Sequence, residues 1–163
     1  MANYCSNCIQ FECSGETLEQ IKSLFNEMAL KEKEKSCGQL PDFIQADKGF
    51  MFDIFWNEDL LFYETRWCPN IEIITAIADH FRAGFTYTYD EMGNLVYGQV
   101  VYKYGILTDT YLELPDFEEY SFSEETDKYS FEGKEYENDY EILEILLKRK
   151  KQQMEQCKFS MNN

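Results

Sequence analysis

Two stretches with the apolar spacing of an amphipathic helix, each preceded by a strand-like pattern, constrain the fold of this chain most strongly. Residues 8–13 alternate apolar and polar side chains, and apolar residues then recur at helical spacing from Thr17 onward. Residues 50–56 and 60–67 predict two strands joined by a polar turn, and residues 71–81 predict a second helix that is followed by a glycine. The pattern therefore begins strand, helix, strand, strand, helix.

Three more strands are predicted at residues 85–90, 95–104 and 106–112. The order β-α-β-β-α-β followed by extra strands is typical of a ferredoxin-like α+β fold, in which one antiparallel sheet carries both helices on one face. We expect this domain to span residues 1–112. The pairing order of the strands does not follow from the pattern.

Negative charge is concentrated in the segment that follows. Residues 113–144 hold 13 Asp and Glu against two Lys, so they carry 13 − 2 = 11 net negative charges of the chain's −16. Residues 113–138 show no sustained apolar period, and we expect an irregular acidic segment threaded with aromatic side chains. The alternative is a partly disordered tether, against which the aromatic content argues, since solvated tails are poor in aromatics.

Residues 139–157 predict a C-terminal helix. Acidic side chains lead it and a basic cluster at residues 148–151 follows, the polarity that suits the helix macrodipole. The sequence leaves open whether this helix packs on its own chain or on a partner.

Three short motifs resemble the YubB ferredoxin-like domain family. They are residues 3–7 at the start of the first strand, residues 63–69 before the second helix, and residues 98–105 in a late hairpin. The resemblance covers about residues 2–112. It implies a ferredoxin-like fold and a genomic home on plasmids, phages and other mobile elements, for a family without an established biochemical activity. It implies no functional residues, and the acidic segment lies outside it.

The cysteines do not form a convincing metal motif. Cys5 and Cys8 have the spacing of a zinc knuckle, but with His80 as the one histidine a fourth ligand would have to come from a distant cysteine. We expect six reduced thiols, no metal and no cofactor.

Catalytic pairs can be drawn but have no supporting signature. Cys68 with His80 would resemble a thiol hydrolase pair, and Asp53 with Glu64, on facing strands of the predicted hairpin, a pair of carboxylates for acid–base chemistry. No phosphate-binding glycine loop or nucleophile elbow accompanies them. We therefore expect a protein that is not an enzyme.

Direct binding of nucleic acid or membrane is disfavoured by the charge. The tyrosine-rich late strands could stack bases, as in RNA-binding proteins of this fold, but only Lys103 accompanies them. The sequence does not begin with a leader-like pattern, and no window is long and apolar enough to span a bilayer. We expect a soluble protein of the bacterial host cytoplasm.

These observations favour a mobile-element accessory protein that binds a basic protein or nucleoprotein complex. Carboxylates on a folded scaffold can imitate the phosphates of a nucleic acid, so an inhibitor of a host defence nuclease, such as an anti-CRISPR protein bound to a CRISPR effector, is the specific hypothesis. The residues expected to contact the partner are Glu113, Asp116, Glu118, Glu119, Tyr120, Glu124, Glu125 and Asp127.

Two alternatives come from other classes of protein. One is an oligomerising adaptor, in which the C-terminal helix pairs with a second copy of the chain or with a partner helix through its Ile/Leu patch. The other is an enzyme of unknown substrate.

Overall fold

The first part of the chain folds as a ferredoxin-like sandwich with two added strands. The computed structural model describes the backbone of residues 3–161 and the side chains of residues 3–157. The elements of this part are, in chain order, β1 (Tyr4–Glu12), α1 (Gly15–Lys35), β2 (Phe52–Asn57), β3 (Leu60–Arg66), α2 (Ile71–Phe81), β4 (Gly84–Glu91), the short 3-10 helix η1 (Met92–Asn94), β5 (Val96–Lys103) and β6 (Ile106–Tyr111).

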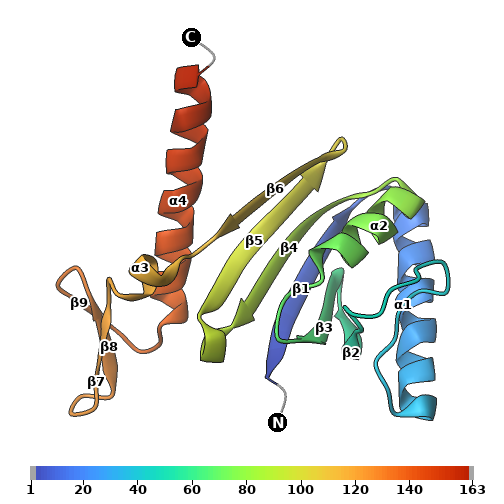
Figure 1. Ribbon diagram of the computed structural model, residues 1–163, viewed down its shortest axis with the longest axis horizontal. Helices are drawn as coiled ribbons and strands as arrows, with labels where there is room; N and C mark the ends of the chain where they lie inside the picture. Colours follow the sequence, from blue (N-terminus) through green and yellow to red (C-terminus); the bar gives the residue numbers. More distant parts are fainter. Residues whose placement is uncertain (1–2, 162–163) are drawn as a thin grey trace.

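The six strands form one antiparallel sheet in the order β2-β3-β1-β4-β5-β6. The first four strands thus interleave, with β1 between β3 and β4, while β5 and β6 extend the sheet as a meander. Both α1 and α2 lie on one face of the sheet (Figure 1). The ferredoxin-like fold and the extra strands expected from the sequence are confirmed.

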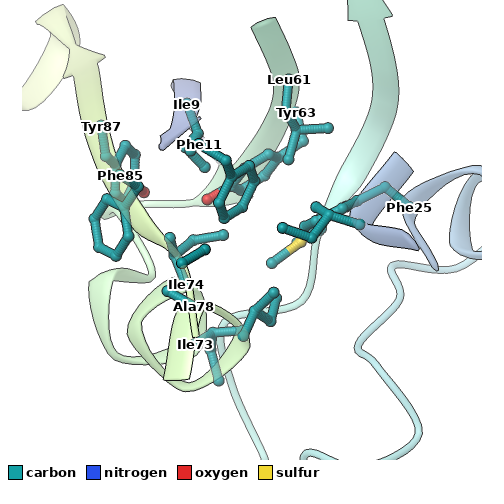
Figure 2. Packing of buried hydrophobic residues seen from close by; sticks show 14 of the residues in the cluster. Ile9, Phe11, Phe25, Leu61, Tyr63, Ile73, Ile74, Ala78, Phe85 and Tyr87 are labelled. Atoms are coloured by element: carbon teal, nitrogen blue, oxygen red, sulfur yellow. The ribbon is translucent and has the colours of Figure 1, made fainter. Parts of the chain in front are cut away.

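Alternation along the strands builds the main core. In β1, Cys5, Ile9 and Phe11 point to the helices and are buried, whereas their neighbours face the other side. They pack with Phe25 of α1 and Ile74 of α2, among others (Figure 2). This single cluster holds the sandwich together.

The first strand is longer than the apolar alternation predicts. It begins at Tyr4 rather than near residue 8, because the buried position 7 is an asparagine that interrupts the apolar pattern. The Asn7 amide Nδ2 donates to the Tyr63 carbonyl at 3.2 Å and to the Thr65 hydroxyl at 3.0 Å. The hydrogen bonds make its burial tolerable.

The expectation that residues 113–138 are irregular is wrong. They contain α3 (Leu114–Phe117) and a second, three-stranded sheet of β7 (Ser121–Ser123), β8 (Lys128–Phe131) and β9 (Lys134–Tyr136). Strands of three or four residues are too short to show a period of two, so the pattern could not reveal them. Helix α4 (Tyr140–Met161) follows, as expected.

Residues 112–161 form what we call the C-terminal unit, which has a core of its own. Its buried side chains come from α3, β8, α4 and the end of the large sheet; they are Leu112, Phe117, Phe131, Ile142, Leu143, Leu146 and Leu147. The Ile/Leu patch of α4 therefore packs on its own chain. Helix α4 lies beside β6, with α3 and the small sheet next to its first turns (Figure 1).

Within the described residues, no helix has the length and apolar character needed to cross a membrane.

Candidate functional site

The β7–β8 hairpin gathers three of the expected contact residues on one turn. Ser123 pairs with Lys128 in the register, and residues 124–127 form the connection, which we call the acidic turn. The Thr126 N–H donates to the Ser123 hydroxyl at 3.4 Å. Asp127 adopts a left-handed conformation with φ 53°, which aspartate tolerates better than most residues. Glu124, Glu125 and Asp127 are exposed.

Aromatic side chains support this hairpin. Phe122 remains 49% exposed and contacts Tyr129 on the paired strand, with ring centroids 4.9 Å apart. Tyr129 in turn lies 6.0 Å from Tyr120, and both tyrosines pack against the second core. Burial, assisted by the negative charge of Asp139, raises the pKa of Tyr120 to about 12. Tyr120 is thus half-buried and stays neutral, while Phe122 is the aromatic open to a partner.

Two of the expected contact residues are occupied inside the unit. Lys150 of α4 lies 2.8 Å from a Glu113 oxygen and 2.5 Å from an Asp116 oxygen. Asp116 also accepts a hydrogen bond from the Glu113 N–H at 2.6 Å, which closes a capping box at the start of α3. Burial lowers the pKa of Lys150, but its hydrogen bonds with the two carboxylates raise it overall. These three residues fasten α3 to α4.

Arg149 makes the corresponding link to the small sheet. Its guanidinium donates two hydrogen bonds to Glu132, at 2.7 and 2.8 Å, and lies over the Phe131 ring at 5.3 Å. The hydrogen bonds from Arg149 lower the pKa of Glu132. Lys128 adds ion pairs with Glu135 and Glu137.

Five of the acids in residues 113–137 are left on the outside of this scaffold, and we call them the acidic surface: Glu118, Glu119, Glu124, Glu125 and Asp127. All five are exposed, and none lies within 4.0 Å of a basic group in the part of the chain that the structure describes. Glu118 and Glu119 lie between α3 and β7, and the other three lie on the acidic turn. Glu119 also contributes to raising the pKa of Arg149.

Sequence reasoning assigned Arg149 and Lys150 no role beyond their place in the basic cluster of the C-terminal helix. The basic cluster was visible as the end of the C-terminal helix, where the macrodipole explains it. The ion pairs give two of its members a second role, which depends on α4 folding back onto α3 and β8. A signal was present in the chain, since the basic cluster directly follows the acidic stretch.

The other candidate sites do not assemble. Cys5 is buried on the helix-covered face of β1, and Cys8, three residues on, faces the opposite side. The two cannot bind one ion together. Among the described residues, no group of three or more His, Cys, Asp or Glu side chains could hold a metal ion.

His80 is a surface residue without a thiol partner in the described part of the chain. Its ring stacks on Phe43, with centroids 4.1 Å apart. Glu64 lies close enough to Asp53 for the two charges to interact. Burial, followed by the negative charges of Asp53 and Glu32, raises the pKa of Glu64. Asp53 and Glu64 are thus close in space, as the sequence predicts, but no surrounding group identifies a reaction.

Comparison with known proteins gives one family. Residues 47–132 match the ferredoxin-like domain of Api92-like proteins, which covers more than half of the chain. The chain belongs to this family. In this member the matched region runs from the loop before β2 through β8, so the family's domain includes the acidic turn. The match begins and ends later than the resemblance at residues 2–112, and it carries the Api92-like name rather than the YubB name.

No curated protein and no solved structure matches the chain.

Proposed function

We propose that this Api92-like protein is a non-enzymatic binding protein that docks a basic protein surface through its acidic surface. The observation that carries the proposal is a division among the acids of residues 113–137. One set pairs with Lys128, Arg149 and Lys150 and stabilises the fold, whereas the acidic surface is left open to solvent.

An ordered scaffold makes such a surface a better ligand than a disordered acidic tail. The acidic turn is held by the β7–β8 pairing, so less conformational entropy is lost when it binds. Five unpaired carboxylates attract a basic groove at long range and displace its counterions, as a nucleic acid would. The exposed Phe122 ring beside the acidic turn can stack on an aromatic side chain of the partner, as a base of the nucleic acid would.

The specific form of the proposal concerns a host defence complex. The resemblance to the YubB family implies carriage by phages or plasmids, and a protein from such an element would act in the bacterial cytoplasm. The partner is then a basic nuclease or nucleoprotein complex, such as a CRISPR effector, and the acidic surface acts as a nucleic-acid mimic. The same charge repels nucleic acid itself.

The adaptor alternative has less support. The Ile/Leu patch of α4 on which it relies is buried in the C-terminal unit, with Ile142 and Leu143 fully inaccessible. A homo-oligomer through α4 would have to use its exposed face, which before Lys151 consists of Tyr140, Glu141, Glu144 and Lys148.

The test is capture of basic proteins at low salt. The full chain is immobilised and exposed to the heparin-binding fraction of a bacterial extract at about 50 mM salt, then washed up to about 300 mM, where exposed charges are strongly screened. Bound CRISPR effectors or nucleases are identified by mass spectrometry and assayed for inhibition. We expect a retained set of nucleic-acid-binding proteins that elutes within this range.

Two variants of equal charge locate the contact. The first neutralises four acids of the acidic surface: Glu118→Gln, Glu124→Gln, Glu125→Gln and Asp127→Asn. The control neutralises four exposed acids of α1: Glu16→Gln, Glu19→Gln, Glu27→Gln and Glu34→Gln. The proposal predicts that only the first variant loses the retained proteins. No retention by the unmodified chain, or equal loss in both variants, would contradict it.

A further inference from the structure

A cavity of about 960 Å³ lies between the loop that precedes β2 and the turn that joins β3 to α2. No residue of the acidic surface lines this cavity. Its volume falls within the range of roughly 300–1,000 Å³ that is usual for small-molecule sites. The lining combines aromatic rings, two cations and two thiols; the residues used below are Lys48, Phe50, Phe52, Arg66, Trp67 and Cys68.

The β3–α2 turn presents Trp67 to this cavity in an unusual backbone conformation. Trp67 has φ 71°, a left-handed value that is strained for a bulky side chain, and its side chain is 52% exposed. The Trp67 N–H donates to the Asn3 carbonyl at 3.0 Å, and the Thr65 hydroxyl donates to the Cys68 carbonyl at 2.8 Å. The fold thus holds the backbone that carries this exposed aromatic side chain.

Buried hydrogen bonds make the wall of the cavity rigid. The Tyr63 hydroxyl donates to Asn70 Oδ1 at 2.6 Å, and Asn70 Nδ2 donates to the Gly49 carbonyl at 2.8 Å. Because its side chain is engaged in this way, Asn70 does not cap α2. In the described part of the chain the N–H groups of Ile71 and Glu72 have no acceptor.

The cations of the cavity are also without carboxylate partners. Neither Lys48 nor Arg66 lies within 4.0 Å of an acid among the described residues, although acids outnumber bases by 31 to 15 in the sequence. Arg66 instead lies over the Phe52 ring at 5.1 Å. Asp47 and Glu72 also line the cavity, with exposed side chains, and limit how much negative charge a ligand can carry.

We propose that this cavity binds a compact aromatic molecule that carries one anionic group, a carboxylate or a phosphate. The ring stacks on Trp67, beside Phe50. The anionic group lies between Lys48, Arg66 and the first turn of α2, where charge-assisted hydrogen bonds are available. This site is independent of the acidic surface.

Trp67 itself reports the test. The chain has two tryptophans, and Trp56 packs against the main core outside the cavity, so Trp56→Phe leaves Trp67 as the only tryptophan, which is excited selectively at wavelengths that tyrosine does not absorb. The probes are phenyl phosphate and benzoate, which share a phenyl ring and do not emit in the tryptophan range, with benzyl alcohol and benzamide as neutral counterparts and inorganic phosphate as an anion without a ring. We expect one aromatic anion to quench Trp67 with half-saturation below about 1 mM, and its neutral counterpart to bind about tenfold more weakly. The aromatic anion that binds more tightly shows whether the site prefers a phosphate or a carboxylate group.

Thiol protection repeats the test in the unmodified chain. Cys37 and Cys68 are exposed and line the cavity, whereas Cys13 and Cys157 are exposed elsewhere. The aromatic anion should slow alkylation of the first two, read by mass spectrometry, and leave the other two unchanged. Lys48→Gln should weaken binding about threefold to tenfold, while the remote Lys134→Gln should not.

Three results would overturn the proposal. They are no quenching and no thiol protection with either aromatic anion at about 10 mM, equal binding of the neutral counterparts, and equal protection of all four thiols.

Discussion

The part of the chain from β1 to β6, which we call the sheet domain, and the C-terminal unit accommodate polar groups in opposite ways. In the sheet domain a polar network lies inside the main core, where the Tyr87 hydroxyl donates to Asn7 Oδ1 at 2.6 Å and accepts from the Asn70 N–H at 3.2 Å. In the C-terminal unit, ion pairs at the surface join Arg149 and Lys150 of α4 to Glu113 and Asp116 at the start of α3 and to Glu132 directly after β8.

The difference follows from the size of the two cores. Among the described residues, twenty buried hydrophobic side chains form the main core and seven form the second. A small core cannot enclose many polar groups, so the charges of the C-terminal unit remain in contact with water. The exposed charges of the C-terminal unit are available to a binding partner. The sheet domain provides stability, and its buried network forms a rigid wall of the cavity.

Removing a large side chain from the main core should have the largest effect. Phe25 of α1 is fully buried and packs near Phe11 and Trp56. Phe25→Ala should lower the free energy of unfolding by about 3–5 kcal/mol, measured by urea denaturation, because a cavity replaces the ring. The same change at the exposed Phe122 should cost about 0.5 kcal/mol or less. Similar losses in both variants would show that the two regions are equally packed.

The C-terminal unit, which contains the second core, should unfold separately from the sheet domain. Leu143→Ala in α4 should destabilise the C-terminal unit by about 2–4 kcal/mol, since Leu143 is fully buried. Hydrogen exchange should accelerate in β7–β9 and α4 and stay unchanged in β1–β4. The control is Leu114→Ala, because Leu114 is 65% exposed. Acceleration throughout β1–β4 would show that the two regions unfold as one.

The buried network should be sensitive to a single hydroxyl. Tyr87→Phe leaves Asn7 Oδ1 with only the weak Cys5 thiol donor and should cost about 1–3 kcal/mol in the free energy of unfolding. Tyr104→Phe is the matched control, since Tyr104 is fully exposed. Equal stability of the two variants would indicate that the network is not a structural element.

Acid should act on the two regions with opposite sign, and this effect is the smallest. Burial raises the pKa of Asp109 in the sheet, so protonation stabilises the folded sheet as pH falls through that raised value, above 3.8. Arg149 lowers the pKa of Glu132, so its contribution is present above about 4.5 and is lost as pH falls through the lowered value.

Region-resolved hydrogen exchange between pH 7 and about 3, corrected for intrinsic rates, should therefore show relative loss of protection in β8 and α4 as pH falls below about 4.5. Glu132→Gln should abolish most of that difference. A uniform response of both regions would argue against the ion pair as the link between α4 and β8.

The sequence predicted those elements whose apolar pattern is long enough to repeat. Helix α2 was expected at residues 71–81 and lies at Ile71–Phe81, because its apolar stripe spans three turns. Strands β7 to β9 escaped prediction since each has three or four residues, and their pairing depends on packing against α4.

The two candidate sites differ in how much of each can be predicted from the sequence. The acids of the acidic surface are neighbours along the chain, so the sequence alone shows the concentration of charge, although it does not show how the side chains are arranged. The division into paired and open acids required α4 to fold back, which no local pattern encodes. The cavity joins residues near 48 to residues near 67, and its rigid wall depends on Asn70 bonding to Gly49 across that gap.

The most direct test of the central claim is a hydrogen-exchange footprint of the complex with a partner captured at low salt. The claim is that the acidic surface, and no part of the sheet domain, contacts the partner. The account predicts slowed exchange in residues 118–130 and unchanged exchange in α1 and in residues 66–73. Protection of α1 or the large sheet, with residues 118–130 unchanged, would contradict it.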